Sequence, residues 1–258
     1  MDIYQHFRKE EQPFIDQVLS WKEQVEQTFQ AKLTEFLDPR EQHIIEMIIG
    51  PTNDDINMYS FGGGLHTERK RVIIAPFYEE RMDDLFQLSL LQASYQNKFI
   101  TLTHPDVMGA FLSLGIKRNK LGDIFVENGM IQIITAAEIA PFILANLTSI
   151  KKAKIKLEEK PLSEKIENEL HWKEMDKTVS SLRLDAVLKE IYNVSRKDAS
   201  EFIHKGQVKV NFKVVEDGKF SLQEGDLLSV RGKGRSKLIK INGRTKKDKW
   251  KIAIAIII

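Results

Sequence analysis

The sequence of 258 residues predicts an α+β protein built from three parts. Near the N-terminus, apolar residues recur at helical spacing, and the middle alternates between strand and helix patterns. The last part has two short helical patterns followed by strand patterns of period two. We therefore expect a helical and hairpin domain over residues 1–75, a middle domain over 76–157, a linker over 158–180 and a C-terminal domain over 181–258.

The N-terminal part is expected to begin with amphipathic helices. Apolar residues from Ile3 to Phe36 recur at spacings of three and four, and Pro13 suits the first turn of a second helix. Asp38 and Glu41 have the spacing of a capping box and should start a further helix. That helix should end at Gly50-Pro51.

A β-hairpin is expected after these helices, with strands near 56–61 and 71–75. The intervening Gly62-Gly63-Gly64 lacks the lysine pattern of a phosphate-binding loop, so a turn that needs positive φ is the better interpretation. Arg69-Lys70-Arg71 follows as a small cationic cluster, which we interpret as a solvated edge.

The middle part has the strand-helix-strand-strand-helix-strand order of a ferredoxin-like fold, which RNA-recognition motifs share. The aromatic strips on which those motifs stack bases are missing, so the fold alone does not predict RNA binding here. The expected strands are Leu85–Ser94, Lys98–Leu102, Asp123–Val126, Met130–Ile134 and Ile150–Leu157, and the expected helices are His104–Leu114 and Ala136–Leu147.

Three cations lie in the loop after the first of these two helices: Lys117, Arg118 and Lys120. They could contact phosphates, or they could be solvated cations near a helix C-terminus, where positive charge suits the helix dipole. The linker that follows the middle part is rich in charge and is expected to be partly helical around Ile166–Trp172.

The C-terminal part should start with two short helices. Ser195 and Asp198 form a capping box that starts the second helix at Arg196. Arg196 and Lys197 then oppose the partial positive charge of the helix N-terminus, an arrangement that a bound anion would stabilise. The alternative is that both side chains bend into solvent.

A small sheet should follow, with strands around Val208–Val210 and Leu227–Val230. The next segment, Arg231–Lys237, places four cations on a turn that contains Gly232 and Gly234. Asn242-Gly243 is a strong hairpin signal between a strand at Leu238–Ile241 and a final strand at Trp250–Ile258.

Charge is distributed unevenly along the chain. Its formal net charge is only +2, yet the part from Ser181 to the end has 18 Lys/Arg against 9 Asp/Glu. A basic module on an acidic remainder indicates a polyanionic partner for one end. No cysteine is present, which excludes disulfides, thiol catalysis and cysteine-based zinc sites and fits a cytoplasmic protein. The six histidines show no metal-ligand spacing, and no apolar run is long enough for a membrane span.

The C-terminal part resembles the small RNA-binding domain of ribosomal small-subunit protein four, called the S-four domain below. Phe212 departs from that pattern, because many members have glycine after the asparagine. The matching residues are Arg183-Leu184-Asp185, Leu188, Ser195-Arg196, Ala199, Ile203, Gly206, Val208, Val210-Asn211, Gly225-Asp226 and Arg231-Gly232.

Nearly the whole chain resembles the YlmH-type bacterial proteins, which join an N-terminal helical part, a middle RNA-binding-type domain and a C-terminal S-four domain. The segments that carry this resemblance are FLDPREQHII, GGGLHTERKRV and KFITLTHPDVMGAFLSLGIKRNKLGDI. The resemblance implies association with the large ribosomal subunit carrying peptidyl-tRNA, in quality control of stalled translation. It also implies a link to cell division through gene neighbourhood.

We therefore expect a non-enzymatic cytoplasmic protein that binds structured rRNA or tRNA, with no cofactor, no metal and no DNA or membrane partner. Gly232 and Gly234 would let the RNA backbone approach closely. The other expected RNA-binding residues are cations: Arg183, Arg196, Lys197, Lys205, Lys209, Arg231, Lys233, Arg235, Lys117, Arg118 and Lys120.

Two alternatives stay open: an rRNA- or tRNA-modifying enzyme, and a cell-division-associated scaffold. His104, Asp106 and Asp123 could form an acid–base set, although a helix cap explains the first two better. Arg183-Leu184-Asp185 resembles the catalytic motif of pseudouridine synthases, in which the catalytic domain follows the S-four domain. In this sequence no segment long enough for such a catalytic domain follows the S-four-like part. Asp185 is therefore interpreted as part of the first C-terminal helix.

Overall fold

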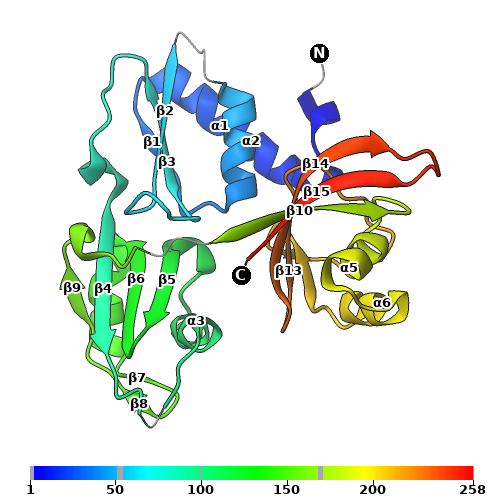
Figure 1. Ribbon diagram of the computed structural model, residues 1–258. Helices are drawn as coiled ribbons and strands as arrows, with labels where there is room; N and C mark the ends of the chain where they lie inside the picture. The colour runs from blue at the N-terminus through cyan, green and yellow to red at the C-terminus, as the bar shows by residue number, and fades with distance from the viewer. Residues whose placement is uncertain (1–2, 51–54, 99, 168–170, 258) are drawn as a thin grey trace. The chain divides into compact units, whose positions relative to one another are not determined.

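The computed structural model describes residues 3–50, 55–98, 100–167 and 171–257. The chain divides into two compact units, Met1–Asn168 and Glu169–Ile258, here called unit 1 and unit 2 (Figure 1). The first two expected domains thus lie together in unit 1. Phe36, from the N-terminal part, is buried in a cluster with Leu90, Phe125 and Ile134 of the middle part, which explains why the two pack as one unit.

The N-terminal part of unit 1 packs two helices against a three-stranded antiparallel sheet of order β1-β3-β2. The capping box at Asp38 and the hairpin of β2 and β3 are confirmed. The helical expectation through Phe36 was wrong, because Phe29 adopts a left-handed conformation that ends α1. The elements are η1 (Ile3–His6), η2 (Lys9–Glu11), α1 (Gln12–Thr28), β1 (Lys32–Leu33), α2 (Pro39–Ile49), β2 (Ile56–Phe61) and β3 (Arg71–Pro76).

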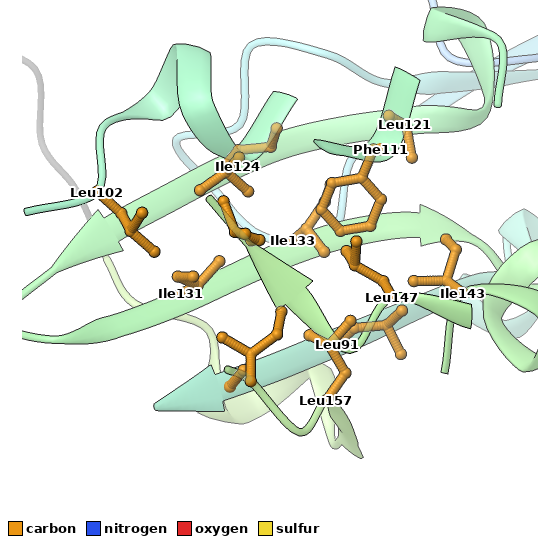
Figure 2. Close-up of a cluster of buried hydrophobic side chains, with 14 of the residues drawn as sticks. Leu91, Leu102, Phe111, Leu121, Ile124, Ile131, Ile133, Ile143, Leu147 and Leu157 are labelled. Carbon is orange, nitrogen blue, oxygen red and sulfur yellow. The ribbon is translucent and has the colours of Figure 1, made fainter. Parts of the chain in front are cut away.

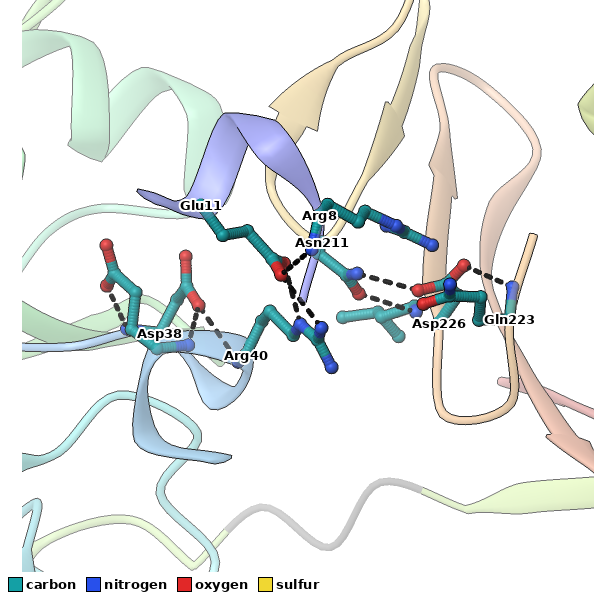
Figure 3. A network of polar contacts seen from close by, with 9 residues as sticks. Arg8, Glu11, Asp38, Arg40, Asn211, Gln223 and Asp226 are labelled. Carbon is teal, nitrogen blue, oxygen red and sulfur yellow. Dashed lines mark hydrogen bonds and ion pairs between the residues drawn. The ribbon is translucent and has the colours of Figure 1, made fainter. Parts of the chain in front are cut away.

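Polar contacts fix the starts of α1 and α2. Glu11, which precedes α1, accepts hydrogen bonds from Arg40 Nε at 2.8 Å and Nη2 at 3.0 Å, and from the backbone N–H of Arg8 at 3.0 Å (Figure 3). Asp38 caps α2 by accepting from the N–H groups of Arg40 and Glu41. Burial raises the pKa of Glu11, but the Arg40 and Arg8 contacts outweigh it and leave that pKa below its ordinary value.

Glycine is required in the triple-glycine segment for two reasons: one position has positive φ, and at the other two a Cβ would clash with neighbouring atoms. Gly63 has φ +90°, as expected, but a Cβ at Gly62 would lie 2.4 Å from the carbonyl oxygen of Arg69. A Cβ at Gly64 would lie 2.0 Å from Cε of the buried Lys165. Arg69 and Arg71 do not form a solvated edge, since both are buried and donate hydrogen bonds to backbone carbonyls.

The middle part is a ferredoxin-like domain with a four-stranded antiparallel sheet of order β5-β6-β4-β9. Helices α3 and α4 supply Val107, Phe111 and Ile143 to one core with Leu91 and Ile133 of the sheet (Figure 2). The elements are η3 (Asp83–Phe86), β4 (Leu88–Ser94), α3 (His104–Ser113), η4 (Arg118–Lys120), β5 (Leu121–Glu127), β6 (Met130–Ala136), η5 (Ala137–Ile139), α4 (Ala140–Asn146), β7 (Ser149–Ile150), β8 (Ala153–Lys154), β9 (Glu158–Lys160) and η6 (Leu162–Glu164).

Three details of this part differ from expectation. Within the expected strand Lys98–Leu102, Lys98 lies in a turn and residues 100–102 are irregular, while Phe99 lies outside the described residues. The final strand is β9 rather than Ile150–Leu157, because β7 and β8 pair with each other as a separate small hairpin. The expected linker 158–180 contains β9 of this sheet and β10 (Trp172–Val179) of unit 2. Its described residues form no α-helix, only the 3-10 turn η6, and residues 168–170 of the helix expected at Ile166–Trp172 lie outside the described part.

Unit 2 packs two helices against one face of a six-stranded antiparallel sheet of order β10-β15-β14-β13-β11-β12. Both expected helices, α5 and α6, are present; α6 begins at Arg196 as expected, and the capping box of Ser195 and Asp198 is confirmed. The remaining elements are α5 (Leu184–Tyr192), α6 (Arg196–His204), β11 (Val208–Val210), β12 (Lys213–Val214), β13 (Leu227–Val230), β14 (Gly234–Arg244) and β15 (Trp250–Ile257).

The hairpin turn expected at Asn242-Gly243 was wrong. These two residues lie inside β14, where the pairing with β15 shifts register between Ile241 and Arg244. Gly243 has φ +83°, so its left-handed conformation serves a β-bulge rather than the turn. The strand therefore continues to Arg244 before the chain reverses.

The β11–β12 turn consists of Asn211 and Phe212, both with positive φ, as in a type I′ hairpin. Phe212 thus occupies a position that usually suits glycine. The Asn211 side chain donates to Asp226 Oδ1 at 2.8 Å and accepts from the N–H of Leu227 at 2.9 Å, which ties the turn to β13 (Figure 3). Asp226 also accepts from the N–H of Gln223 at 2.8 Å.

Candidate nucleic-acid interface

Two arginines meet on one carboxylate where α5 and α6 begin. Arg183, the N-cap residue of α5, donates to Asp185 through Nε at 3.0 Å and Nη2 at 2.8 Å. Arg196, the first residue of α6, reaches the same carboxylate through Nε at 3.3 Å and Nη2 at 3.2 Å. The carboxylate is 5% exposed, whereas the Arg183 and Arg196 side chains are 37% and 63% exposed. The guanidinium groups are therefore held in place and still face solvent.

This trio keeps a positive charge. Burial raises the pKa of Asp185, but the hydrogen bonds and charges of Arg183 and Arg196 outweigh it, so that the pKa lies below its ordinary value. Asp185 is ionised at neutral pH, and two guanidinium groups against one carboxylate leave one net positive charge. Lys197 follows Arg196 and is exposed. Planar guanidinium groups in fixed positions are suited to bidentate binding of phosphate.

A second group of the expected residues lies at the other end of α6, about 14 Å away by the rise of an α-helix. Lys205 forms an ion pair with Glu201 there. The turn Arg231–Lys233 is close by in the fold, because the N–H of Arg231 donates to the carbonyl of Gln207 at 3.0 Å. Arg231 and Lys233 are exposed. The glycines Gly232 and Gly234 have φ +77° and +93° and leave the backbone of this turn accessible.

The remaining two expected residues of unit 2 lie on the opposite face of the sheet. Val208 and Val210 point into the core, so Lys209 between them points away from the helices. Arg235 shares this outward face, since both Lys209 and Arg235 pair with Ser229 of β13. The Arg235 guanidinium lies 5.9 Å from the centre of the Phe212 ring. The expected RNA-binding residues of unit 2 thus occupy three places rather than one continuous surface.

The cations of the η4 loop in unit 1 have mainly structural contacts. Lys120 forms ion pairs with Glu35 and Glu138. The Arg118 guanidinium donates to the carbonyls of Leu121 and Gly122 at the start of β5. Lys117 is exposed. We therefore place the candidate interface in unit 2.

The candidate acid–base residues are explained by structural contacts as well. Asp106 accepts from the N–H and Oγ1 of Thr103 and pairs with Lys151 at 2.7 Å, while His104 is the first residue of the helix that Thr103 caps. Asp123 accepts from the N–H groups of Glu68 and Arg69 at 2.6 and 3.1 Å. Burial raises the pKa of Asp123 in spite of those two hydrogen bonds.

Among the described residues, no group of three or more His, Cys, Asp or Glu side chains is placed to hold a metal ion. Within the same part of the chain, none of the helices has both the length and the apolar character that crossing a membrane requires.

The sequence interpretation missed the role of Asp185 and a set of lysines on the β14–β15 hairpin. Asp185 was assigned to the first helix alone, because its contact with Arg196 depends on how α5 and α6 pack. The run Lys246-Lys247-Asp248-Lys249 could have indicated these lysines. The turn was instead expected at Asn242-Gly243, which lie inside β14.

Comparison with family models gives three consecutive matches. The model "YlmH, N-terminal" matches residues 10–79, and "Putative RNA-binding domain in YlmH" matches residues 81–164. The "S4 domain" model matches residues 182–228, within the S-four domain.

Similar proteins cover the chain to different extents. The ribosome-associated protein quality control protein P2 of Bacillus subtilis is 44% identical over 251 residues, which is 97% of each chain. An uncharacterized RNA pseudouridine synthase of Aquifex aeolicus is 42% identical over 52 residues, 20% of this chain and 22% of that protein. The structure of the cell division protein ylmH from Streptococcus pneumoniae aligns with a TM-score of 0.55 and 32% identity, covering 64% of this chain and 99% of that one.

Proposed function

Because the chain belongs to the YlmH family, we propose that it binds structured RNA and associates with the ribosome in the cytoplasm, without catalysing a reaction. At the finer level, we propose that it binds the large ribosomal subunit carrying peptidyl-tRNA, in quality control of stalled translation. The name of the B. subtilis relative, which describes ribosome-associated quality control, supports this proposal.

The observation that carries the proposal is the pair of arginines held by Asp185. A surface that only needed solubility would not require two guanidinium groups fixed on one buried carboxylate. Fixed guanidinium groups lose little conformational entropy when they bind a phosphate, since their positions are set beforehand. Side chains cannot read the deep groove of an RNA helix, so phosphate and 2′-hydroxyl contacts would select folded RNA by its shape.

Co-sedimentation with purified large ribosomal subunits tests the proposal. The wild-type protein should pellet with the subunits at low salt and be released as KCl is raised. The double variant Arg196→Gln/Lys197→Gln should bind more weakly, and its slope of log affinity against log salt should be shallower by about 1.4 to 1.8.

A matched control is Lys152→Gln/Lys154→Gln, which removes the same charge from two exposed lysines of unit 1. It should bind like the wild type. If both variants lost the same affinity for the subunit, binding would depend only on the total charge of the protein. If wild-type binding did not change with salt, phosphate contacts would be contradicted.

Incubation with ribosomal RNA and likely cofactors, followed by nucleoside mass spectrometry, tests the absence of catalysis. We expect no new modified nucleoside. The match to the pseudouridine synthase covers only about a fifth of either chain and gives no support for a catalytic domain here.

A further inference from the structure

The β14–β15 hairpin has a concentration of lysines outside the set expected to bind RNA. The turn between the strands is formed by Thr245–Lys249, in which Lys246, Lys247 and Lys249 are exposed. Figure 1 shows this turn where the orange strand β14 passes into the red strand β15. The matched S4 domain segment ends at residue 228, so the whole hairpin follows it in the chain.

The turn is held in one conformation by its own hydrogen bonds. The N–H of Thr245 donates to the carbonyl of Lys249 at 2.7 Å, and the N–H of Lys249 donates to Thr245 Oγ1 at 3.1 Å. Arg244 lies 4.4 Å from the centre of the Trp250 ring and forms an ion pair with Asp248. The single carboxylate in the turn is thus occupied by Arg244.

The three lysines of the turn therefore present uncompensated charge. In the described part of the chain, no carboxylate lies within ion-pair distance of Lys246, Lys247 or Lys249, in contrast to Lys205 and Lys120. Solubility alone would be served by charges of either sign. A turn that carries three free cations on a rigid frame is suited to a polyanion.

More lysines continue along one face of the hairpin. Lys251, Ala253 and Ala255 alternate along β15 and share a face, and Lys240 and Lys237 of β14 lie opposite the two alanines. The other face is buried in the core. Ala255 is buried and Ala253 is half-buried, whereas Lys237, Lys240 and Lys251 are exposed, so the accessible groups on this face are the lysines.

This positive stripe has a boundary on the same face. Glu174 and Asp176 of β10 lie opposite Ala255 and Ala253 on the far side of β15. The positive charge on this face is therefore confined to the turn, Lys251 and the lysines of β14, and ends before β10. A directional stripe of this kind fits a linear anion, which RNA supplies through its phosphodiester backbone.

We propose that the β14–β15 hairpin is a second RNA-contacting surface that binds phosphates of structured RNA separately from α5 and α6. This inference rests on the proposed function and extends it to residues outside the matched S4 domain segment. The contacting groups are Lys246, Lys247 and Lys249 of the turn, followed by the stripe of Lys251, Lys240 and Lys237.

A binding titration of the full-length protein with a fluorescein-labelled RNA stem-loop, repeated over a KCl series, tests this inference. The variant Lys246→Gln/Lys247→Gln/Lys249→Gln removes three cations and leaves Arg244, Asp248 and Trp250 in place. Its slope of log affinity against log salt should be shallower by about 2 to 3 than that of the wild type. Its affinity at low salt should fall at least about tenfold.

The control Lys152→Gln/Lys154→Gln/Lys156→Gln makes the same change of charge in exposed residues of unit 1 and should bind like the wild type. As a second readout, bound RNA should protect the three turn lysines from acetylation while Lys152 and Lys154 stay reactive. Thermal melts of both variants should match the wild type, because none of the substituted side chains is buried.

The outcomes separate the two proposals. A turn variant that binds like its control, with no protection of the turn lysines, would overturn the hairpin surface. The proposed function would still stand if Arg196→Gln/Lys197→Gln weakened binding in the same assay. Wild-type protein that bound no RNA would overturn both, and salt-dependent binding to phosphatidylserine vesicles but not to RNA would assign the hairpin to another partner.

Discussion

Asp185 lies in the first turn of α5, and its carboxylate accepts hydrogen bonds from arginines that begin two different helices. Without this carboxylate, the two guanidinium groups would repel each other and adopt many orientations. An acidic residue here improves a basic surface, because fixed geometry matters as much as total charge when a phosphate is bound.

The variant Asp185→Asn tests this role. It makes unit 2 more positive by one charge, yet we expect weaker RNA binding, because Arg183 and Arg196 lose their shared anchor. The free energy of unfolding should fall by about 1.5 to 3 kcal/mol, the range for hydrogen bonds to charged groups. Chemical denaturation and a titration with an RNA stem-loop measure the two effects, and tighter binding by the variant would contradict the model.

Single residues show what a sequence can reveal and what it cannot. Ser195 and Asp198 cap α6 as expected, since capping depends on residues close together in the chain. The pairing of Asp185 with Arg196 could not be read in the same way, because it depends on the packing of two helices. Lys120 was misjudged for the same reason: its partners Glu35 and Glu138 are far from it in sequence.

At the scale of elements, Asp106 connects the start of α3 to the β7–β8 turn. It completes a capping box with Thr103 and pairs with Lys151 of that turn at 2.7 Å. The hydrogen bonds from Lys151 and Thr103 lower the pKa of Asp106 from 3.8 to about 2. The folded state thus favours the ionised carboxylate.

Stability should depend on pH through this group. A lowered pKa in the folded state stabilises the protein at pH values above about 4, and the contribution disappears as pH falls toward about 2. Asp106→Asn should therefore melt at a lower temperature than the wild type near pH 7, and the two melting temperatures should converge as pH falls to about 2. The exposed variant Asp84→Asn is the control. A difference that stayed constant over this pH range would rule out the carboxylate as its cause.

Elements were predicted well where local signals and core packing agreed, as in the β2–β3 hairpin and the two helices of unit 2. The turn predicted at Asn242-Gly243 was wrong because a glycine in the left-handed conformation occurs in β-bulges as well as in hairpin turns. The linker 158–180 was expected to lack strands because β9 and β10 are short or mostly polar. Both lie at sheet edges, where only one neighbouring strand specifies them.

At the scale of the molecule, the hydrophobic cores divide the chain into two units, and the uneven distribution of charge along the sequence does not reveal that the first two parts share a core. The middle part shares its core with the N-terminal part through Phe36, and a Cβ at Gly122 would lie 2.8 Å from the Phe36 ring. Unit 2 has a separate core that includes Leu188, Ile203 and Ile254. The asymmetry of charge was visible in the sequence, whereas the shared core of unit 1 depends on contacts between distant residues.

A polypeptide of residues 169–258 should therefore fold alone and carry most of the RNA binding. We expect a cooperative thermal transition by circular dichroism, because the core of unit 2 is complete within it. The slope of its log affinity for an RNA stem-loop against log salt should equal that of the full-length protein. A much shallower slope would show that unit 1 supplies phosphate contacts of its own.

Lys165 links the last segment of unit 1 to the glycine loop between β2 and β3. Its side chain is 2% exposed, lies where a Cβ at Gly64 would clash, and has its ammonium 5.2 Å from the centre of the Phe125 ring. Strands β2 and β3 and the segment after β9 therefore cannot loosen independently. Exchange of their backbone amides with deuterium would report one common opening event, and the early and late parts of unit 1 would lose protection together.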